Sequence, residues 1–152
     1  MSKLYSAMNV ARTIIRECDV AGFRINNFIL QKALFLVQVR AIKTGTLAFA
    51  DQIKAWPIGP VVEDVYYYFS PHGSCDINPN VYGGDCVLFD STVSIIRQVV
   101  EEIKDKPAWG VHLMTNHPGG SWEMAYGDGS GYDCRHYSRG NVIPFCAMRD
   151  LE

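Results

Sequence analysis

The segment that decides the fold is FILQKALFLVQV, residues 28–39. It is apolar on nearly every side, and a helix of this kind must be covered on all its faces. The sequence therefore predicts a helix over about residues 27–44 that lies in the middle of a bundle. Three polar residues interrupt the apolar run, and we expect them to form one narrow polar strip: Gln31, Lys32 and Gln38.

Further helices are predicted on both sides of the central one. Apolar residues that recur at steps of three and four indicate amphipathic helices over residues 4–21 and 91–104. Shorter helices are expected over residues 61–69, 109–115 and 121–126, and from Pro144 onward.

The predicted β content is small. Residues 52–56 are a candidate edge strand, and residues 85–89 are a candidate second strand. Pro57 and the pair Gly59-Pro60 are expected to exclude regular structure between residues 57 and 60. The expected fold class is therefore mainly α: a single helical-bundle domain over residues 1–152, with at most a small two-stranded β element.

The composition excludes several classes of protein. The chain has 152 residues, of which 48% are hydrophobic and 20% charged, as is typical of one globular domain. Its net charge is −2, whereas a nucleic-acid binder usually carries a clear basic excess. No segment has the roughly 18 uninterrupted apolar residues of a membrane span, and the N-terminus does not resemble a signal peptide. We expect a cytoplasmic protein that binds no nucleic acid.

Five cysteines and four histidines raise the question of disulfides or bound metal. The cysteines are odd in number and no two are spaced as C-x-x-C, so reduced thiols are the simplest interpretation. Structural zinc sites usually use paired C-x-x-C or H-x-x-x-H units, and the chain has neither. We therefore expect no metal and no cofactor.

Three segments resemble signatures of the Panacea (SocA-like) antitoxin family. The first is LQKALFLVQ at residues 30–38. The second, IKAWPIGPVVEDVY at residues 53–66, is similar to the family's Ala-Trp-x-x-Gly-Pro-Val-Val followed by Val-Tyr. The third, NHPGGSWEMAY at residues 116–126, resembles a Thr-His segment that leads into Pro-Trp, with Asn116 and Ser121 where threonine and proline are usual.

The resemblance implies a mostly helical fold and a role as the antitoxin half of a toxin–antitoxin pair, often on phages and mobile elements. It also implies that the protein hands the bound toxin to a cellular protease, as SocA-like members are thought to do. The expected activity is protein binding without catalysis, and the expected partners are a cognate toxin, a host protease or a host defence protein. An alternative on the same fold is a phage or mobile-element protein that inhibits a host defence protein.

Two neighbouring motifs are candidates for the partner-binding surface. Residues 56–60, WPIGP, form either a rigid elbow that only docks the loop on the central helix or the rim of a binding groove. Residues 66–69, YYYF, cannot all face the core, because successive helical residues are about 100° apart. The candidate partner-binding residues are Trp56, Gly59, Pro60, Tyr66, Tyr67, His117 and Trp122.

A hydrolase or transferase with an unrecognised motif is the further alternative. Its candidate groups are His117, Asp128 and Cys134. The chain lacks a G-x-S-x-G nucleophile elbow, and GDGSG at residues 127–131 lacks the lysine of a P-loop. His117 precedes a proline, so it is also interpreted as a turn residue whose ring forms a local hydrogen bond.

Overall fold

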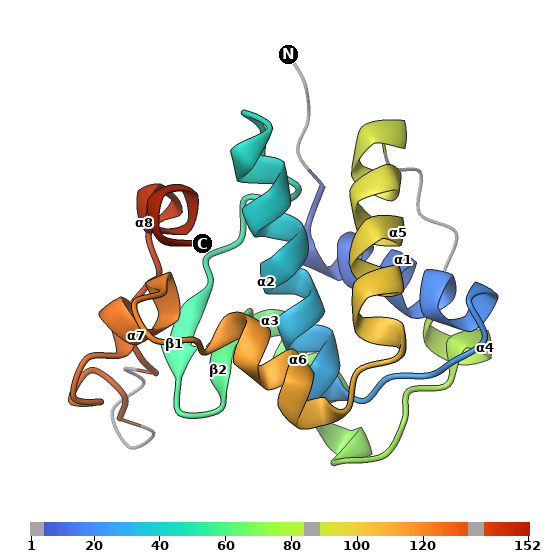
Figure 1. Ribbon diagram of the computed structural model, residues 1–152. Helices are drawn as coiled ribbons and strands as arrows, with labels where there is room; N and C mark the ends of the chain where they lie inside the picture. Colours follow the sequence, from blue (N-terminus) through green and yellow to red (C-terminus); the bar gives the residue numbers. More distant parts are fainter. Residues whose placement is uncertain (1–4, 84–88, 134–138) are drawn as a thin grey trace.

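The computed structural model describes residues 5–83, 89–133 and 139–152 (Figure 1). It is mainly helical with one small antiparallel sheet of two strands, which confirms the predicted fold class. The strands are β1 (Lys54–Trp56) and β2 (Gly59–Val61), and a 3₁₀ turn, η1 (Ser70–His72), follows the third helix. The helices of the described residues are α1 (Ala7–Val20), α2 (Asn27–Lys43), α3 (Glu63–Phe69), α4 (Pro79–Tyr82), α5 (Asp90–Lys104), α6 (Ala108–Thr115), α7 (Ser121–Tyr126) and α8 (Phe145–Leu151).

Helix α2 occupies the centre of the molecule (Figure 1), and it packs against α1, α3, α5, α6, α8 and β2. Its side chains are buried without interruption from Leu30 to Val39, as the apolar segment predicted. Asn26 caps the helix, because its side chain accepts a hydrogen bond from the Ile29 N–H at 3.0 Å. The helix has 17 residues, and in the described parts of the chain neither it nor any other helix is long and apolar enough to cross a membrane.

The other elements cover α2 from different sides. The amphipathic helices α1 and α5 pack against it and against each other. Helix α6 contacts both α2 and β2, α8 contacts α2, and α7 lies against β1 and α8. The predicted stripe of α5 is buried at Ile96, Val100 and Ile103 and half-buried at Val93, and the core-facing side also includes Thr92, Ile95 and Val99.

The expected polar strip on α2 is wrong, because Gln31, Lys32 and Gln38 are all buried. Each side chain binds the backbone of the segment that connects α2 to α3. The Gln38 Oε1 accepts from the Ala48 N–H at 2.9 Å, and its Nε2 donates to the Phe49 carbonyl at 2.7 Å.

The other two buried polar side chains hold the end of the same segment. The Gln31 Oε1 accepts from the Val62 N–H at 3.0 Å, and the Lys32 Nζ donates to the Ile58 carbonyl at 2.6 Å. A buried backbone group without a partner costs about 1–3 kcal/mol, so these polar side chains allow a loop backbone to pass through the core.

The prediction of irregular structure at residues 57–60 is also wrong, because β2 begins at Gly59 and pairs with β1. Trp56 lies opposite Gly59, and Ala55 lies opposite Pro60. Pro60 is compatible with this pairing because the Ala55 N–H points to the other side of β1, where it donates to the Asn141 carbonyl at 2.9 Å. Proline and glycine therefore form a hairpin here.

Two further differences concern the segment between α3 and α5. The short helix α4 was not expected, and it begins where Asn78 precedes Pro79, a favourable capping sequence. The candidate strand at residues 85–89 lies outside the described residues, apart from Phe89, which is the N-cap of α5.

We expect Gly59→Ala to destabilise the protein by about 3 kcal/mol. The φ of Gly59 is +121°, and an added Cβ would lie 2.6 Å from the Lys32 Nζ and 2.7 Å from the Asn116 Oδ1. Gly22→Ala is the matched control, because its φ is +93° and no atom lies within 4 Å of the added Cβ. It should lose only about 1–2 kcal/mol. Equal losses in urea denaturation would contradict the close approach at Gly59.

We expect Gln38→Leu to lower the free energy of unfolding by about 2–4 kcal/mol, because the Ala48 N–H and the Phe49 carbonyl lose their partner inside the core. Gln52→Leu replaces an exposed glutamine in the following segment and should change stability by less than about 0.5 kcal/mol. Chemical denaturation of both variants checks this, and a neutral Gln38→Leu would show that Gln38 does not hold the loop.

Candidate functional site

Trp56 is the centre of an aromatic cluster at the end of β1. It is 3% exposed, and two tyrosines of α3 meet its ring edge-on, with centroids 4.9 Å (Tyr66) and 6.1 Å (Tyr67) away. Tyr132, from the glycine-rich loop, approaches in the same way at 5.8 Å. Edge-to-face packing at these distances is favourable and holds the rings in fixed positions.

Arg139 completes the cluster. Its guanidinium carbon lies 5.7 Å from the centroid of the Trp56 ring and 5.3 Å from that of the Tyr67 ring. Both are cation–π distances, which favour a charge held over an electron-rich face. We call Trp56, Tyr66, Tyr67, Tyr132 and Arg139 the aromatic surface.

Consecutive tyrosines on α3 separate into two environments. Tyr67 is 43% exposed and belongs to the aromatic surface, whereas Tyr68 is 45% exposed and faces other neighbours. The Tyr68 ring meets Tyr82 at 6.0 Å, and Arg12 donates a hydrogen bond of 3.4 Å to its hydroxyl. This confirms that the four-aromatic run cannot be buried whole, and it provides two equally exposed tyrosines on different sides of one helix.

The remaining candidate residues support the cluster or lie outside it. The Trp122 Nε1 donates to the Trp56 carbonyl at 2.8 Å, so α7 clamps the end of β1. Gly59 and Pro60 are buried in β2, where they lie opposite Trp56 and Ala55 of β1. The structure therefore brings together every candidate partner-binding residue except His117.

Sequence reasoning missed Tyr132 and Arg139, because they lie in a glycine-rich stretch interpreted as an exposed loop. The structure pairs these two residues in an isolated antiparallel bridge. The glycines beside them close the loop, since the Gly140 N–H donates to the Gly131 carbonyl at 3.0 Å. The sequence signal that could have indicated them is an aromatic residue and an arginine, each next to a glycine.

A buried lysine lies beneath the elbow. Lys32 is 1% exposed, its Nζ lies 4.2 Å from the centroid of the Phe28 ring, and burial lowers its pKa to about 8. The ring of His112 stacks on the same Phe28 ring, with centroids 6.0 Å apart. Burial, together with the charge of Lys32, lowers the pKa of His112. Perturbed groups of this kind often mark active sites, but the Lys32 amine is enclosed and already donates to the Ile58 carbonyl, so it supports the elbow.

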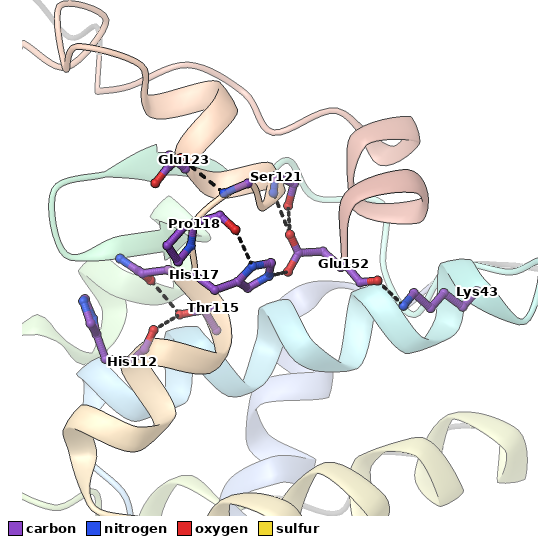
Figure 2. Close-up of polar contacts among 10 residues, drawn as sticks. Lys43, His112, Thr115, His117, Pro118, Ser121, Glu123 and Glu152 are labelled. Carbon is purple, nitrogen blue, oxygen red and sulfur yellow. Dashed lines mark hydrogen bonds and ion pairs between the residues drawn. The ribbon is translucent and has the colours of Figure 1, made fainter.

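His117 belongs to a separate cluster around the Glu152 carboxylate (Figure 2). The His117 Nε2 lies 2.8 Å from the Glu152 Oε1, and the Ser121 N–H and hydroxyl donate to the Oε2 at 2.6 and 2.9 Å. The Lys43 amine donates to the Glu152 backbone carbonyl. Glu152 thus joins the end of α8 to the start of α7 through its carboxylate and to α2 through its backbone carbonyl.

This cluster has the residue types of an acyl-transfer triad in a different order. In such a triad the histidine contacts the serine hydroxyl and the carboxylate lies behind the histidine. Here the carboxylate lies between Ser121 and His117 (Figure 2), so the imidazole is not placed to take the serine proton. The arrangement holds elements together.

Of the other groups of the enzyme alternative, the structure describes only Asp128. The Asp128 carboxylate accepts from the Ser130 N–H at 2.9 Å in a local turn, and hydrogen bonds from the Ser130 side chain and backbone lower the pKa of Asp128. Cys134 lies outside the described residues. Among the described residues, no group of three or more histidine, cysteine or acidic side chains is placed to hold a metal ion.

Comparison with known proteins gives no match: no family model, no curated protein and no solved structure matches the chain.

We expect the pKa of His117 to lie above its ordinary value of 6.5, mainly because its ring hydrogen-bonds to the Glu152 carboxylate. A raised pKa in the folded state means that protonated His117 stabilises the fold. This stabilisation is fully present below pH 6.5 and is lost as the pH rises through the raised pKa. NMR titration of the ring should show the raised pKa of His117 and its decrease in Glu152→Gln. A His117 pKa that Glu152→Gln leaves unchanged would contradict this.

Proposed function

We propose that the protein is a protein-binding antitoxin or proteolytic adaptor, which neutralises a cognate toxin in the cytoplasm by direct contact through the aromatic surface. The observation that carries this proposal is the partly exposed Tyr67, held in place by Trp56 and Arg139. The resemblance of three segments to the Panacea family supports it and suggests that the protein is encoded on a phage or mobile element.

The aromatic surface has the composition and rigidity of a binding hot spot. Tryptophan, tyrosine and arginine contribute most to the energy of protein interfaces. The Trp56 side chain is already fixed by its neighbours and its backbone by Trp122. Little side-chain entropy is then lost on association, which favours affinity.

The proposed activity is binding without catalysis and without a cofactor. The position of the Glu152 carboxylate between Ser121 and His117 supports this over a hydrolase. A second candidate uses the same surface: a phage or mobile-element protein that inhibits a host defence protein. The identity of the partner distinguishes the two.

Capture from the native host, with tagged protein and mass spectrometry, should identify a partner in stoichiometric amount. The partner should arrest growth when expressed alone, and the wild-type protein should restore growth. Tyr67→Ala should weaken binding by about tenfold or more, as expected for loss of a hot-spot tyrosine, and should fail to restore growth. Calorimetric titration and a growth assay measure these effects.

Tyr68→Ala is the matched control, because it removes an equally exposed tyrosine from the adjacent position of the same helix. It should bind and protect like the wild-type protein. Loss of binding in both variants would point to a general effect on α3, and full binding by Tyr67→Ala would place the interface elsewhere. A captured partner that is a non-toxic defence protein would favour the second candidate.

A further inference from the structure

Three of the described basic side chains differ from the other nine: Arg24, Lys104 and Lys106. Within the described residues, none of these side chains takes part in a hydrogen bond, ion pair or ring contact. Every other described arginine or lysine meets a carboxylate, a carbonyl or hydroxyl oxygen, or an aromatic ring: Arg12, Arg16, Lys32, Arg40, Lys43, Lys54, Arg97, Arg139 and Arg149. The three unpartnered cations are therefore a specific feature.

All three line the same pocket, which has a volume of about 270 Å³. The loop between α1 and α2, the end of α5 and the start of α6 form its walls. Asp76 is the single acidic residue among the described residues of the lining, so the pocket is positively charged although the chain carries a net charge of −2.

The rest of the lining is largely apolar. Ile25, Ile103 and Val111 are buried, and Phe23 and Ile29 are half-buried. Helix α6 lines the pocket with Ala108 and Val111, whereas its two large exposed apolar side chains, Trp109 at 69% and Leu113 at 53%, lie on another face of the helix.

We infer that this basic pocket docks a segment of a partner protein in which acidic side chains flank an apolar one. The apolar side chain covers Phe23 and Ile29, and the carboxylates meet Arg24, Lys104 and Lys106. These cations form no ion pairs with any residue that the structure describes, so a carboxylate can pair with them without breaking one of the ion pairs described here. The pocket shares no residue with the aromatic surface, so the inference does not depend on the proposed function.

The lining favours a peptide over a nucleic acid. Binding to nucleic acid rests on many cations that follow a line of phosphates, whereas here three cations surround an apolar floor. A phosphate backbone would leave that floor uncovered, but an apolar side chain between carboxylates covers it.

Selection from a random 12-residue peptide library on the whole wild-type protein tests this. Selection should enrich peptides with aspartate or glutamate beside leucine, isoleucine or phenylalanine. Their binding should shift amide signals of residues 23–29 and 103–111 in NMR spectra. Fluorescence anisotropy of a selected peptide should show an affinity that decreases with salt and decreases by at least about fivefold in Lys104→Gln/Lys106→Gln.

Lys43→Gln/Arg149→Gln is the matched control, because it removes the same number of charges from side chains that already have partners. It should change the affinity by less than about twofold. Thermal unfolding should show that both double variants fold. The inference is overturned if no peptide is enriched, if the enriched peptides lack acidic residues, if both variants bind alike, or if a 12-nucleotide single strand binds the pocket more tightly than the peptides.

Discussion

The hydrogen bond from the Lys32 amine to the Ile58 carbonyl brings a basic group into the core, at a position where burial disfavours its charge. Two features offset this cost: the face of the Phe28 ring beside the amine, and the absence of a Cβ on Gly59, which lets the elbow backbone come close. Lys32 and Gly59 are therefore coupled. A larger residue at position 59 would displace the amine and leave the Ile58 carbonyl unpaired.

The rigidity of the aromatic surface depends on the hydrogen bond between Lys32 and the Ile58 carbonyl. The elbow sets the position of β1, and β1 is held from its other edge by the Asn141 carbonyl and by the Ile143 N–H, which donates to the Ile53 carbonyl at 2.8 Å. Trp56 at the end of β1 is thus fixed by the central helix, by α7 and by the segment that follows the glycine-rich loop. Segments far apart in sequence therefore fix the position of the Trp56 ring, and the tyrosines and Arg139 pack around this ring.

The helices were predictable from their apolar residues, whose periodicity shows the buried face of α1 and α5 and whose continuous run places α2 at the centre. The same signal failed for Gln31, Lys32 and Gln38, since periodicity cannot show that a loop backbone will supply buried partners for polar side chains. Strand β2 was missed because Pro60 and Gly59 usually interrupt strands, and only the tertiary pairing reveals that no N–H is needed from residue 60. Arg139 is more than seventy residues from Tyr67 in sequence, so no local pattern joins them.

Whole-chain charge is a poor guide to the basic pocket for a related reason. The net charge of −2 counts every cation equally, but a cation that already contacts a carboxylate or an aromatic face contributes little further attraction. Among the described residues, only Arg24, Lys104 and Lys106 keep their full attraction for a negatively charged ligand, and they line one pocket with an apolar floor.

The aromatic surface and the basic pocket therefore differ in physical character. The first offers preorganised shape, whose contribution salt hardly changes, and the second offers unpaired charge, whose contribution salt screens. The salt dependence of an interaction thus indicates which of the two surfaces a partner uses.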